Sequence, residues 1–341
     1  MLNTIYRLIE PRKIEVEFNE LDLSKDKVIV RPTHLSICNA DQRYYQGKRD
    51  PEALAKKLPM ALIHEGIGTV VYDGKGQFET GEVVVMIPNT PVEEDDVISE
   101  NYLRSSKFRA SGFDGFMQDN IEMDRDRLVS LPDEIDKNVA AFIEIISVSH
   151  HAINRFDAFS HERKEHIAVW GDGNLAFITA LLLRYKYPEA NLYVMGLVRE
   201  KLAEFTFVDE TYHIQEIPEN IVIDHAFECV GGEGSPKAIN QIIDCIKPEA
   251  TVSILGVSEN LVPINTRMIL EKGLRIFGSS RSGRKDFQDT VDMLKEHPEI
   301  VEHLKSIVGE VVDVRSIEDM HIAFEKDISK AYGKTIMLWN V

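Results

Sequence analysis

Four side chains in the first half of the chain are of the types that bind metal ions. They are Cys38, the adjacent pair His64 and Glu65, and Glu144. Zinc binds thiolate, imidazole and carboxylate groups, and a catalytic zinc keeps one position for water or substrate. Each residue also has an ordinary structural role open to it, as a small buried Cys, a core His or a paired acid. Because the four are scattered along the chain, their spacing alone leaves both interpretations open.

A second pattern indicates a dinucleotide site. In segment 166–176, His-Ile-Ala-Val-Trp-Gly-Asp-Gly-Asn-Leu-Ala, a strand-like run leads into G-x-G-x-x-A and then into an apolar helix. Gly171 allows a tight turn, Gly173 lets the backbone approach a pyrophosphate, and Ala176 lets helix and strand pack closely. The helix N-terminus offers N–H groups and a positive dipole end to the phosphates. We therefore predict dinucleotide binding here, against the alternative of a plain strand-to-helix turn.

The next expected strand, 191–196, bears on which dinucleotide is bound. NAD sites usually carry Asp or Glu at the end of this strand, where the acid accepts hydrogen bonds from the ribose. Gly196 stands in that position, and Arg199 and Lys201 follow it. A missing acid with nearby cations favours the 2′-phosphate of NADP(H). In the alternative, the two cations are solvated residues and Glu200 is the displaced acid.

The segments that position these residues follow two different sequence patterns. Short β-branched runs at 27–31, 68–72 and 82–87 are separated by turn segments at 73–76 and 88–91. Short strands at this spacing predict an antiparallel, barrel-like β-rich domain.

After about residue 138 strands alternate with helices. A helix-like segment at 139–154 comes first, and a helix at 286–295 and a returning strand at 334–339 come last; between them we expect strands at 166–170, 191–196, 222–229, 251–255 and 274–278. This alternation predicts a parallel, doubly wound α/β sheet. The expected domains are 1–144 for metal binding and catalysis, 145–282 for the dinucleotide, and 283–341 returning to the catalytic domain.

Length and composition agree with two domains and exclude several classes of function. The 341 residues carry 39 Lys+Arg and 57 Asp+Glu, for a net charge of −18. Such a charge opposes binding to nucleic acid or to an anionic membrane. The three cysteines are scattered, which excludes a disulfide framework and suits the reducing cytoplasm. The longest apolar run, 176–183, is too short to span a membrane, and the first residues lack a secretory pattern, so we expect a soluble cytoplasmic protein.

Three segments resemble the zinc-dependent medium-chain dehydrogenases. Segment 36–47 is similar to their G-I-C-G-T-D…G motif, 62–70 to G-H-E-x-x-G-x-V, and 141–152 to the A-x-x-E-P-L-A-V-x-x-H-A of the polyol branch. The resemblance implies a Rossmann domain and a GroES-like catalytic domain. It also implies a catalytic zinc on Cys38, His64 and Glu144, with Glu65 as a fourth or exchanging ligand, and Asp41 orienting His64.

Two departures from the family pattern matter. The region 86–112 has no cysteine, whereas many members hold a second, structural zinc on four cysteines there, so we expect one zinc per chain. The hydroxyl residue that relays the proton two positions after the ligand Cys is Ala40 here. A water held by Glu144 or Glu65, or the phenol of Tyr44 or Tyr45, remain as alternative relays.

Segments 88–91, 224–232 and 278–283 are similar to one branch of this family, the ribulose-5-phosphate reductases of teichoic acid synthesis. This resemblance implies NADPH-dependent reduction of D-ribulose 5-phosphate to D-ribitol 5-phosphate. It also implies that a cytidylyltransferase acts next and is a candidate partner. A homo-oligomer, dimer or tetramer, is expected. The alternatives are an NAD-linked dehydrogenase of unphosphorylated polyols, a metal-free reductase and a catalytically silent relative.

A sugar phosphate needs a cationic subsite, because Arg and Lys are the usual partners of phosphate. Three candidates stand out in this acidic chain, each of them also interpretable as a solvated face: Arg43 near the metal segment; Arg104, Lys107 and Arg109; and Arg281, Arg284 and Lys285.

Overall fold

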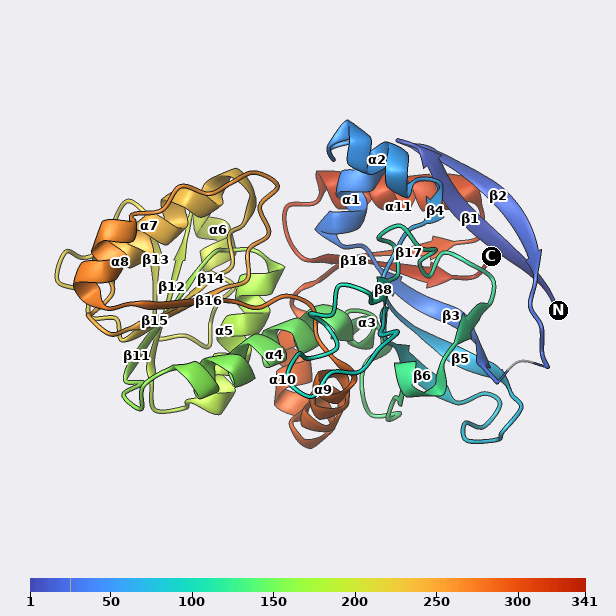
Figure 1. Cartoon of the computed structure of the whole chain (residues 1–341), viewed down its shortest axis with the longest axis horizontal. Helices are drawn as coiled ribbons and strands as arrows, with labels where there is room; N and C mark the ends of the chain where they lie inside the picture. The colour runs from blue at the N-terminus through green and yellow to red at the C-terminus, as the bar shows by residue number, and fades with distance from the viewer. Residues whose placement is uncertain (25) are drawn as a thin grey trace. The chain divides into compact units, whose positions relative to one another are not determined.

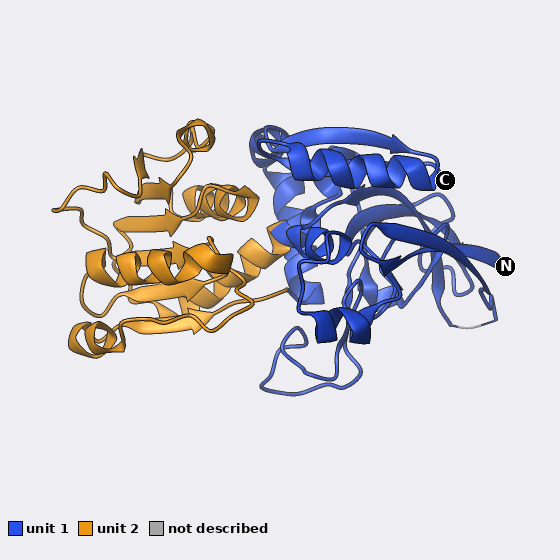
Figure 2. Cartoon of the chain, turned by 90° about the horizontal axis from the view of Figure 1, so that it is seen from above, with its two compact units in different colours: residues 1–145, 282–341 blue, residues 146–281 orange. Residues whose placement is uncertain are grey.

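The structure, a computed structural model, describes residues 1–24 and 26–341 (Figure 1). The chain forms two compact units (Figure 2). Unit 1 consists of residues 1–145 and 282–341, and unit 2 of residues 146–281.

A seven-stranded sheet forms the body of unit 1, in the order β10-β6-β5-β3-β18-β17, with β9 beside β3. The neighbours are antiparallel except for β17 and β18, which are parallel. The strands are β3 (Val28–Ser36), β5 (Glu65–Asp73), β6 (Val83–Met86), β9 (Ile121–Met123), β10 (Leu128–Ser130), β17 (Val308–Val314) and β18 (Lys334–Trp339). The expected returning strand is therefore β18, which inserts between β3 and β17.

Two smaller sheets complete the strands of unit 1. One has the order β2-β1-β4, and the other pairs β7 with β8. Their bounds are β1 (Leu2–Glu10), β2 (Lys13–Glu20), β4 (Met60–Ala61), β7 (Asn89–Thr90) and β8 (Lys107–Phe108).

Several helices of unit 1 begin at side-chain caps, and α11 buries one face. Asp50 caps α2 with Pro51 in its first turn, and Ser316 caps α11. Helix α11 buries Met320, Phe324 and Asp327 at helical spacing. The helices are α1 (Asn39–Tyr45), α2 (Pro51–Lys57), α3 (Lys137–Ala140), α9 (Arg284–Glu296), α10 (Pro298–Lys305) and α11 (Ile317–Ser329), with a 3-10 turn η1 (Arg125–Arg127).

Unit 2 is built on a six-stranded, all-parallel sheet in the order β13-β12-β11-β14-β15-β16. Along the chain this order reads 3-2-1-4-5-6, that of a Rossmann fold, with the switch point between β11 and β14. The strands are β11 (His166–Trp170), β12 (Asn191–Gly196), β13 (Glu210–His213), β14 (His225–Glu228), β15 (Thr251–Ile254) and β16 (Arg275–Gly278). The connecting helices are α5 (Asn174–Lys186), α6 (Arg199–Leu202), α7 (Ser235–Cys245) and α8 (Thr266–Lys272), with a 3-10 turn η2 (Gly232–Gly234).

The predicted fold class, a doubly wound sheet with a β-rich N-terminal domain, is confirmed. Helix α4 (Ile143–Phe159) runs from unit 1 into unit 2. The strand expected at 222–229 is shorter, at His225–Glu228. None of the helices in residues 1–24 and 26–341 is long and apolar enough to cross a membrane.

Candidate metal and cofactor sites

Three of the four predicted metal ligands converge in unit 1. The Cys38 thiol, a ring nitrogen of His64 and a carboxylate oxygen of Glu65 all lie within 4.8 Å of one another. Strand register explains the meeting: Ser36 at the end of β3 pairs with Glu65 at the start of β5. The donors are a thiol, an imidazole and a carboxylate, which together suit zinc.

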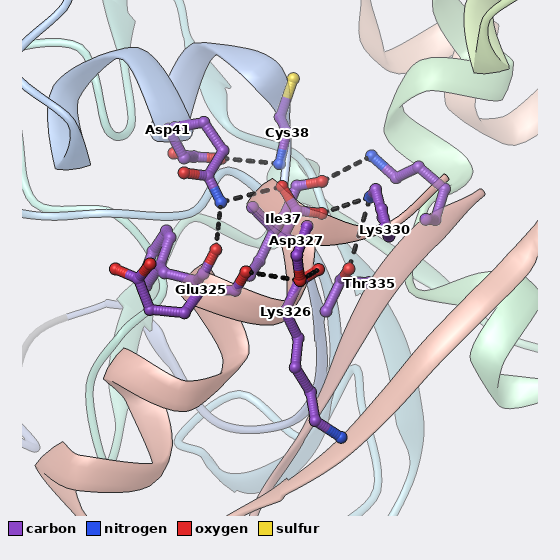
Figure 3. A network of polar contacts seen from close by, with 12 residues as sticks. Ile37, Cys38, Asp41, Glu325, Lys326, Asp327, Lys330 and Thr335 are labelled. Carbon is purple, nitrogen blue, oxygen red and sulfur yellow. Dashed lines mark hydrogen bonds and ion pairs between the residues drawn. The ribbon is translucent and has the colours of Figure 1, made fainter. Parts of the chain in front are cut away.

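Asp41, in the first turn of α1, fixes the backbone beside two of these ligands. Its Oδ2 accepts the Cys38 N–H at 3.1 Å, a contact visible in Figure 3. Its Oδ1 accepts the Ile63 N–H at 3.0 Å and lies 3.6 Å from Nδ1 of His64. Burial acts to lower the pKa of His64, but Asp41 and the Cys38 thiol together outweigh burial, so the pKa is raised. Asp41 faces Nδ1, so Nε2 is the His64 nitrogen left for a metal.

Ile63, the residue before His64, has a left-handed backbone conformation with φ of 71°. This conformation is unfavourable for a β-branched side chain, so the surrounding structure must impose it. Two hydrogen bonds do so: the Ile63 N–H goes to Asp41, and its carbonyl accepts the Phe116 N–H at 2.7 Å.

Lys334 supplies a buried positive charge that the sequence did not reveal. It lies on β18 and is 2% exposed. Its Nζ donates to the Ile37 carbonyl at 3.0 Å and contacts the two Glu65 oxygens at 3.0 and 2.8 Å. Figure 3 shows the surrounding network, in which Lys330 bonds Asp327 and Thr335. The ion pair compensates the buried charge of Glu65 and fixes its carboxylate.

Glu144 stands beside this group but outside it. It occupies the first turn of α4 and is buried. Burial, aided by the nearby charge of Glu65, raises its pKa to about 7, while His64 opposes the shift. Cys38, His64 and Glu65 form the predicted metal-binding group. The structure places Glu144 within electrostatic reach of this group without bringing its oxygens into the 4.8 Å cluster.

Of the alternative proton relays, the two phenols differ. The Tyr45 hydroxyl contacts Nδ1 of His321 at 2.8 Å and donates to Glu325 at 3.3 Å, so it is engaged by α11. Burial and the Glu325 carboxylate raise the pKa of Tyr45 to about 12. The Tyr44 hydroxyl accepts a hydrogen bond from Lys57. Ala40 lies in α1 and has no hydroxyl.

The glycine turn of unit 2 has the shape that a dinucleotide requires. Gly171 has φ of 133°, and a Cβ there would lie 3.2 Å from the Cβ of Ala176 and from the Cys229 backbone. A Cβ on Gly173 would meet no atom within 4 Å, so the backbone is open to an incoming group. Gly173 also caps the N-terminus of α5. These are the conditions for a pyrophosphate above a helix N-terminus.

The end of β12 holds an acid that the sequence analysis did not assign. A Cβ on Gly196 would lie 2.8 Å from the Cβ of Asp172. The Asp172 Oδ2 accepts the N–H groups of Leu197 and Val198 at 2.7 and 2.8 Å. A carboxylate therefore does stand beside this strand end, supplied from the glycine turn instead of from the strand.

The two cations expected near a 2′-phosphate are differently engaged. Arg199 is exposed and forms an ion pair with Glu216. Lys201 is half-buried and pairs with no carboxylate in the described parts of the chain, 1–24 and 26–341.

The candidate cations for the substrate phosphate are scattered over the structure. Arg109 donates to the carbonyls of Asp114 and Glu122 at 3.3 and 2.7 Å, and burial lowers its pKa to about 10. The Arg109 guanidinium therefore holds two backbone carbonyls of the neighbouring loop. Of the other candidates, Arg104 is exposed, Arg43 and Arg281 are half-buried, and Lys107 lies 5.7 Å from the Phe113 ring centroid. The backbone N–H of Arg284 donates to Glu100, and Lys285 forms an ion pair with Asp289.

Comparison with known proteins places this architecture in a family. Residues 24–133 match the alcohol dehydrogenase GroES-like domain, and residues 201–296 match the zinc-binding dehydrogenase domain. The ribulose-5-phosphate reductase of Bacillus spizizenii is 56% identical over 341 residues, covering 100% of both chains. Ribulose-5-phosphate reductase 1 of Staphylococcus aureus is 54% identical over 339 residues, covering 99% of both.

Solved structures agree. The crystal structure of S. aureus TarJ in complex with NADPH superposes with a TM-score of 0.90, at 49% identity and covering 99% of both chains. The chain belongs to the zinc-binding dehydrogenases with a GroES-like domain and, within them, to the ribulose-5-phosphate reductase family.

Proposed function

We propose that this protein reduces D-ribulose 5-phosphate to D-ribitol 5-phosphate with NADPH. The C2 ketone takes a hydride from NADPH, and the resulting alkoxide takes one H⁺ that comes ultimately from solvent, giving the secondary alcohol and NADP⁺. The observation that carries the proposal is the convergence of Cys38, His64 and Glu65 in a chain that is 56% identical to a ribulose-5-phosphate reductase.

Unit 1 is the metal-binding part in this proposal. Cys38, His64 and Glu65 would hold one zinc ion, with Glu144 beside them as a further ligand. When bound, such an ion acts as a Lewis acid on the substrate oxygen. Asp41 keeps the backbone of Cys38 and Ile63 in place, and Lys334 holds the Glu65 carboxylate.

Unit 2 is the cofactor-binding part. Gly171, Gly173 and Ala176 shape the turn before α5, where the pyrophosphate of NADPH would lie against open backbone. Arg199 and Lys201 supply positive charge after Gly196 for the 2′-phosphate. The NADPH named in the structure of S. aureus TarJ supports this choice of cofactor.

The product of this reaction is a polyol phosphate, and we propose that a cytidylyltransferase of teichoic acid synthesis consumes it. The cytoplasm is the proposed location, and a homo-oligomer the proposed state. The similarity to the ribulose-5-phosphate reductases supports these assignments.

A second candidate function is NAD-linked dehydrogenation of unphosphorylated polyols. The sorbitol dehydrogenase of Bacillus subtilis is 25% identical over 289 residues, covering 79% of this chain. The specific observation in its favour is the Asp172 carboxylate beside Gly196, because NAD enzymes place an acid there.

One assay separates the two. Oxidation of NADPH and of NADH is measured with ribulose 5-phosphate and with D-ribulose, before and after chelation of metal. The proposed function requires rapid, chelator-sensitive turnover with NADPH and ribulose 5-phosphate. Equal rates with NADH and D-ribulose would support the second candidate, and no turnover by a zinc-replete sample would exclude both.

A further inference from the structure

Lys57, at the end of α2, carries a charge that no acid in the described parts of the chain balances. Its side chain is half-buried, and its Nζ donates to the Tyr44 hydroxyl and to the Ser111 hydroxyl, each at 3.0 Å. Within residues 1–24 and 26–341, Lys57 forms no ion pair. A partly desolvated ammonium between two neutral hydroxyls is unusual in a chain of net charge −18, because a carboxylate partner would stabilise it.

A second cation lies against the same phenol. The Arg49 guanidinium carbon is 4.6 Å from the centroid of the Tyr44 ring, and Lys57 Nζ is 5.7 Å from it. The Tyr44 side chain is buried, so its ring is a fixed platform. We refer to Arg49, Lys57, Tyr44 and Ser111 as the Lys57 cluster. Ammonium, guanidinium and hydroxyl groups are the kinds of donor that bind anions in proteins.

One turn connects this cluster with the metal-binding group. The Ser111 N–H donates to the Phe108 carbonyl at 3.2 Å, and the ends of such a four-residue turn lie within about 7 Å of each other. At one end Ser111 bonds Lys57, and at the other the Phe108 ring lies 5.4 Å from the His64 ring, centroid to centroid. The loop is anchored beyond the turn, where Gly115 donates to the Ala61 carbonyl at 2.8 Å.

The backbone next to Ser111 leaves room beside the ammonium. Gly112 has φ of 92°, and a Cβ there would meet only the Lys57 Cγ, at 3.7 Å. The glycine therefore places no side chain over Lys57, and the hydrogen-bonding groups of the cluster are not covered from this position.

Resting on the proposed function, we propose that Lys57, together with the hydroxyls of Ser111 and Tyr44, binds the phosphate group of the sugar-phosphate substrate. Five covalent bonds separate the ketone carbon of ribulose 5-phosphate from its phosphorus, so the ketone and the phosphate can be bound at two neighbouring subsites. A phosphate dianion supplies the negatively charged partner that Lys57 lacks, and its oxygens accept hydrogen bonds from the ammonium and the hydroxyls. Lys57 is then the residue that makes the enzyme prefer a phosphorylated substrate.

The test compares two substrates in four proteins. The proteins are the wild type, Lys57→Gln, Lys57→Arg and Lys56→Gln, and the substrates are ribulose 5-phosphate and D-ribulose, both with saturating NADPH. Lys56 is the matched control, because it is the exposed neighbour of Lys57 on α2. Inorganic phosphate is added as a competing anion, and the melting temperature of each protein is recorded.

We expect Lys57→Gln to lower kcat/KM for ribulose 5-phosphate by about 10- to 100-fold, the range of one charged hydrogen bond. The loss should lie mainly in KM, turnover of D-ribulose should be unchanged, and inhibition by inorganic phosphate should weaken. Lys57→Arg should restore most of the loss, and Lys56→Gln should behave as wild type.

Two results overturn the inference while the proposed function stands. One is an active wild type with an unchanged KM for ribulose 5-phosphate in Lys57→Gln. The other is an equal loss with both substrates, since that would show a purely structural role. A wild type inactive on ribulose 5-phosphate overturns the proposed function and this inference with it. Ser111→Ala keeps the test informative if Lys57→Gln fails to fold, and a several-fold rise in the same KM is expected for it.

Discussion

The metal-binding group of unit 1 and the glycine turn of unit 2 are organised by opposite means. In unit 1 the decisive groups are charged or ionisable side chains under the surface: Glu65 is fully buried, His64 nearly so, and Lys334 is 2% exposed. In unit 2 the decisive feature is missing side chains, at Gly171, Gly173 and Gly196. One site is therefore defined by which atoms are present, and the other by which are absent.

This difference predicts how each site fails. Removing one group in unit 1 leaves buried partners uncompensated, which costs more than the lost contact itself. Adding an atom in unit 2 creates a clash with backbone or fills the space meant for a ligand. The two kinds of damage have different readouts, in metal content for unit 1 and in cofactor affinity for unit 2.

The largest effect is expected from Cys38→Ser. Loss of the thiolate ligand should reduce bound zinc and lower kcat/KM by on the order of 10³-fold, since a Lewis acid supplies several kcal/mol. Zinc is measured by elemental analysis and NADPH binding by fluorescence titration. NADPH affinity should stay within about twofold of wild type, because unit 2 is untouched. Cys245→Ser, at the end of α7, is the control. A zinc-replete and active Cys38→Ser would show that the Cys38 thiol is not needed for zinc binding.

Asp41→Asn should have the next largest effect, a loss of about 10- to 100-fold in zinc affinity or turnover. An amide oxygen can still accept one of the two backbone N–H bonds, but the charge facing His64 is gone. Competition with a chelator of known zinc affinity measures the change. Wild-type zinc retention would show that Asp41 has only a structural role.

Gly171→Ala and Gly173→Ala should separate shape from stability in unit 2. The first substitution has a strained φ and contacts at 3.2 Å, so we expect a loss of about 1–3 kcal/mol in unfolding free energy together with weaker NADPH binding. The second adds a methyl group to open space, so stability should hardly change while NADPH affinity falls by about tenfold. Chemical denaturation and fluorescence titration measure the pair. Equal losses of unfolding free energy in the two variants would contradict this difference between Gly171 and Gly173.

Asp172→Asn should change cofactor choice by a smaller factor. The amide can keep accepting the Leu197 and Val198 N–H groups, while the negative charge beside Gly196 is removed. We expect the ratio of kcat/KM for NADPH over NADH to rise by about five- to tenfold, because repulsion of a 2′-phosphate falls and a ribose hydroxyl loses a charged acceptor. A lower ratio would mean that Asp172 acts only by accepting the backbone hydrogen bonds of Leu197 and Val198.

The last prediction concerns the pH dependence of stability, through His225 of unit 2. Its Nε2 donates to the Arg163 carbonyl and its Nδ1 accepts the Thr251 N–H, so the structure uses the neutral ring. Burial, aided by His161, lowers its pKa to about 4. A lowered folded-state pKa contributes stability that is complete above the unfolded value near 6.5 and is lost as pH falls toward 4, at most about 3 kcal/mol. The stability gap between wild type and His225→Gln should therefore narrow from pH 7 to pH 5; a constant gap would refute this.

The sequence predicted best where local pattern decides structure. The run 166–176 is strand, turn and helix as expected, because the requirements of Gly171 and Ala176 are local. Cys38, His64 and Glu65 were named from motifs, and the pairing of β3 with β5 brings them together.

Residues whose role depends on distant pairing were not predicted. Lys334 lies 269 positions from Glu65, and only the register of β18 against β3 brings it there. Asp172 was passed over inside the glycine pattern, although an acid between the two glycines was a visible signal. Lys57 was missed because its lack of an acid partner is a property of the fold, with only the neighbouring Lys56 to mark it in the sequence.

The insertion of β18 between β3 and β17 has a consequence for how the protein is made. The ribosome completes all of unit 2 before it adds Lys334, so a nascent chain holds Cys38, His64 and Glu65 long before their buried counter-charge exists. During that interval β3 also lacks one of its sheet neighbours. The Glu65 carboxylate therefore gains its buried counter-charge only after β18 has been made and has paired with β3.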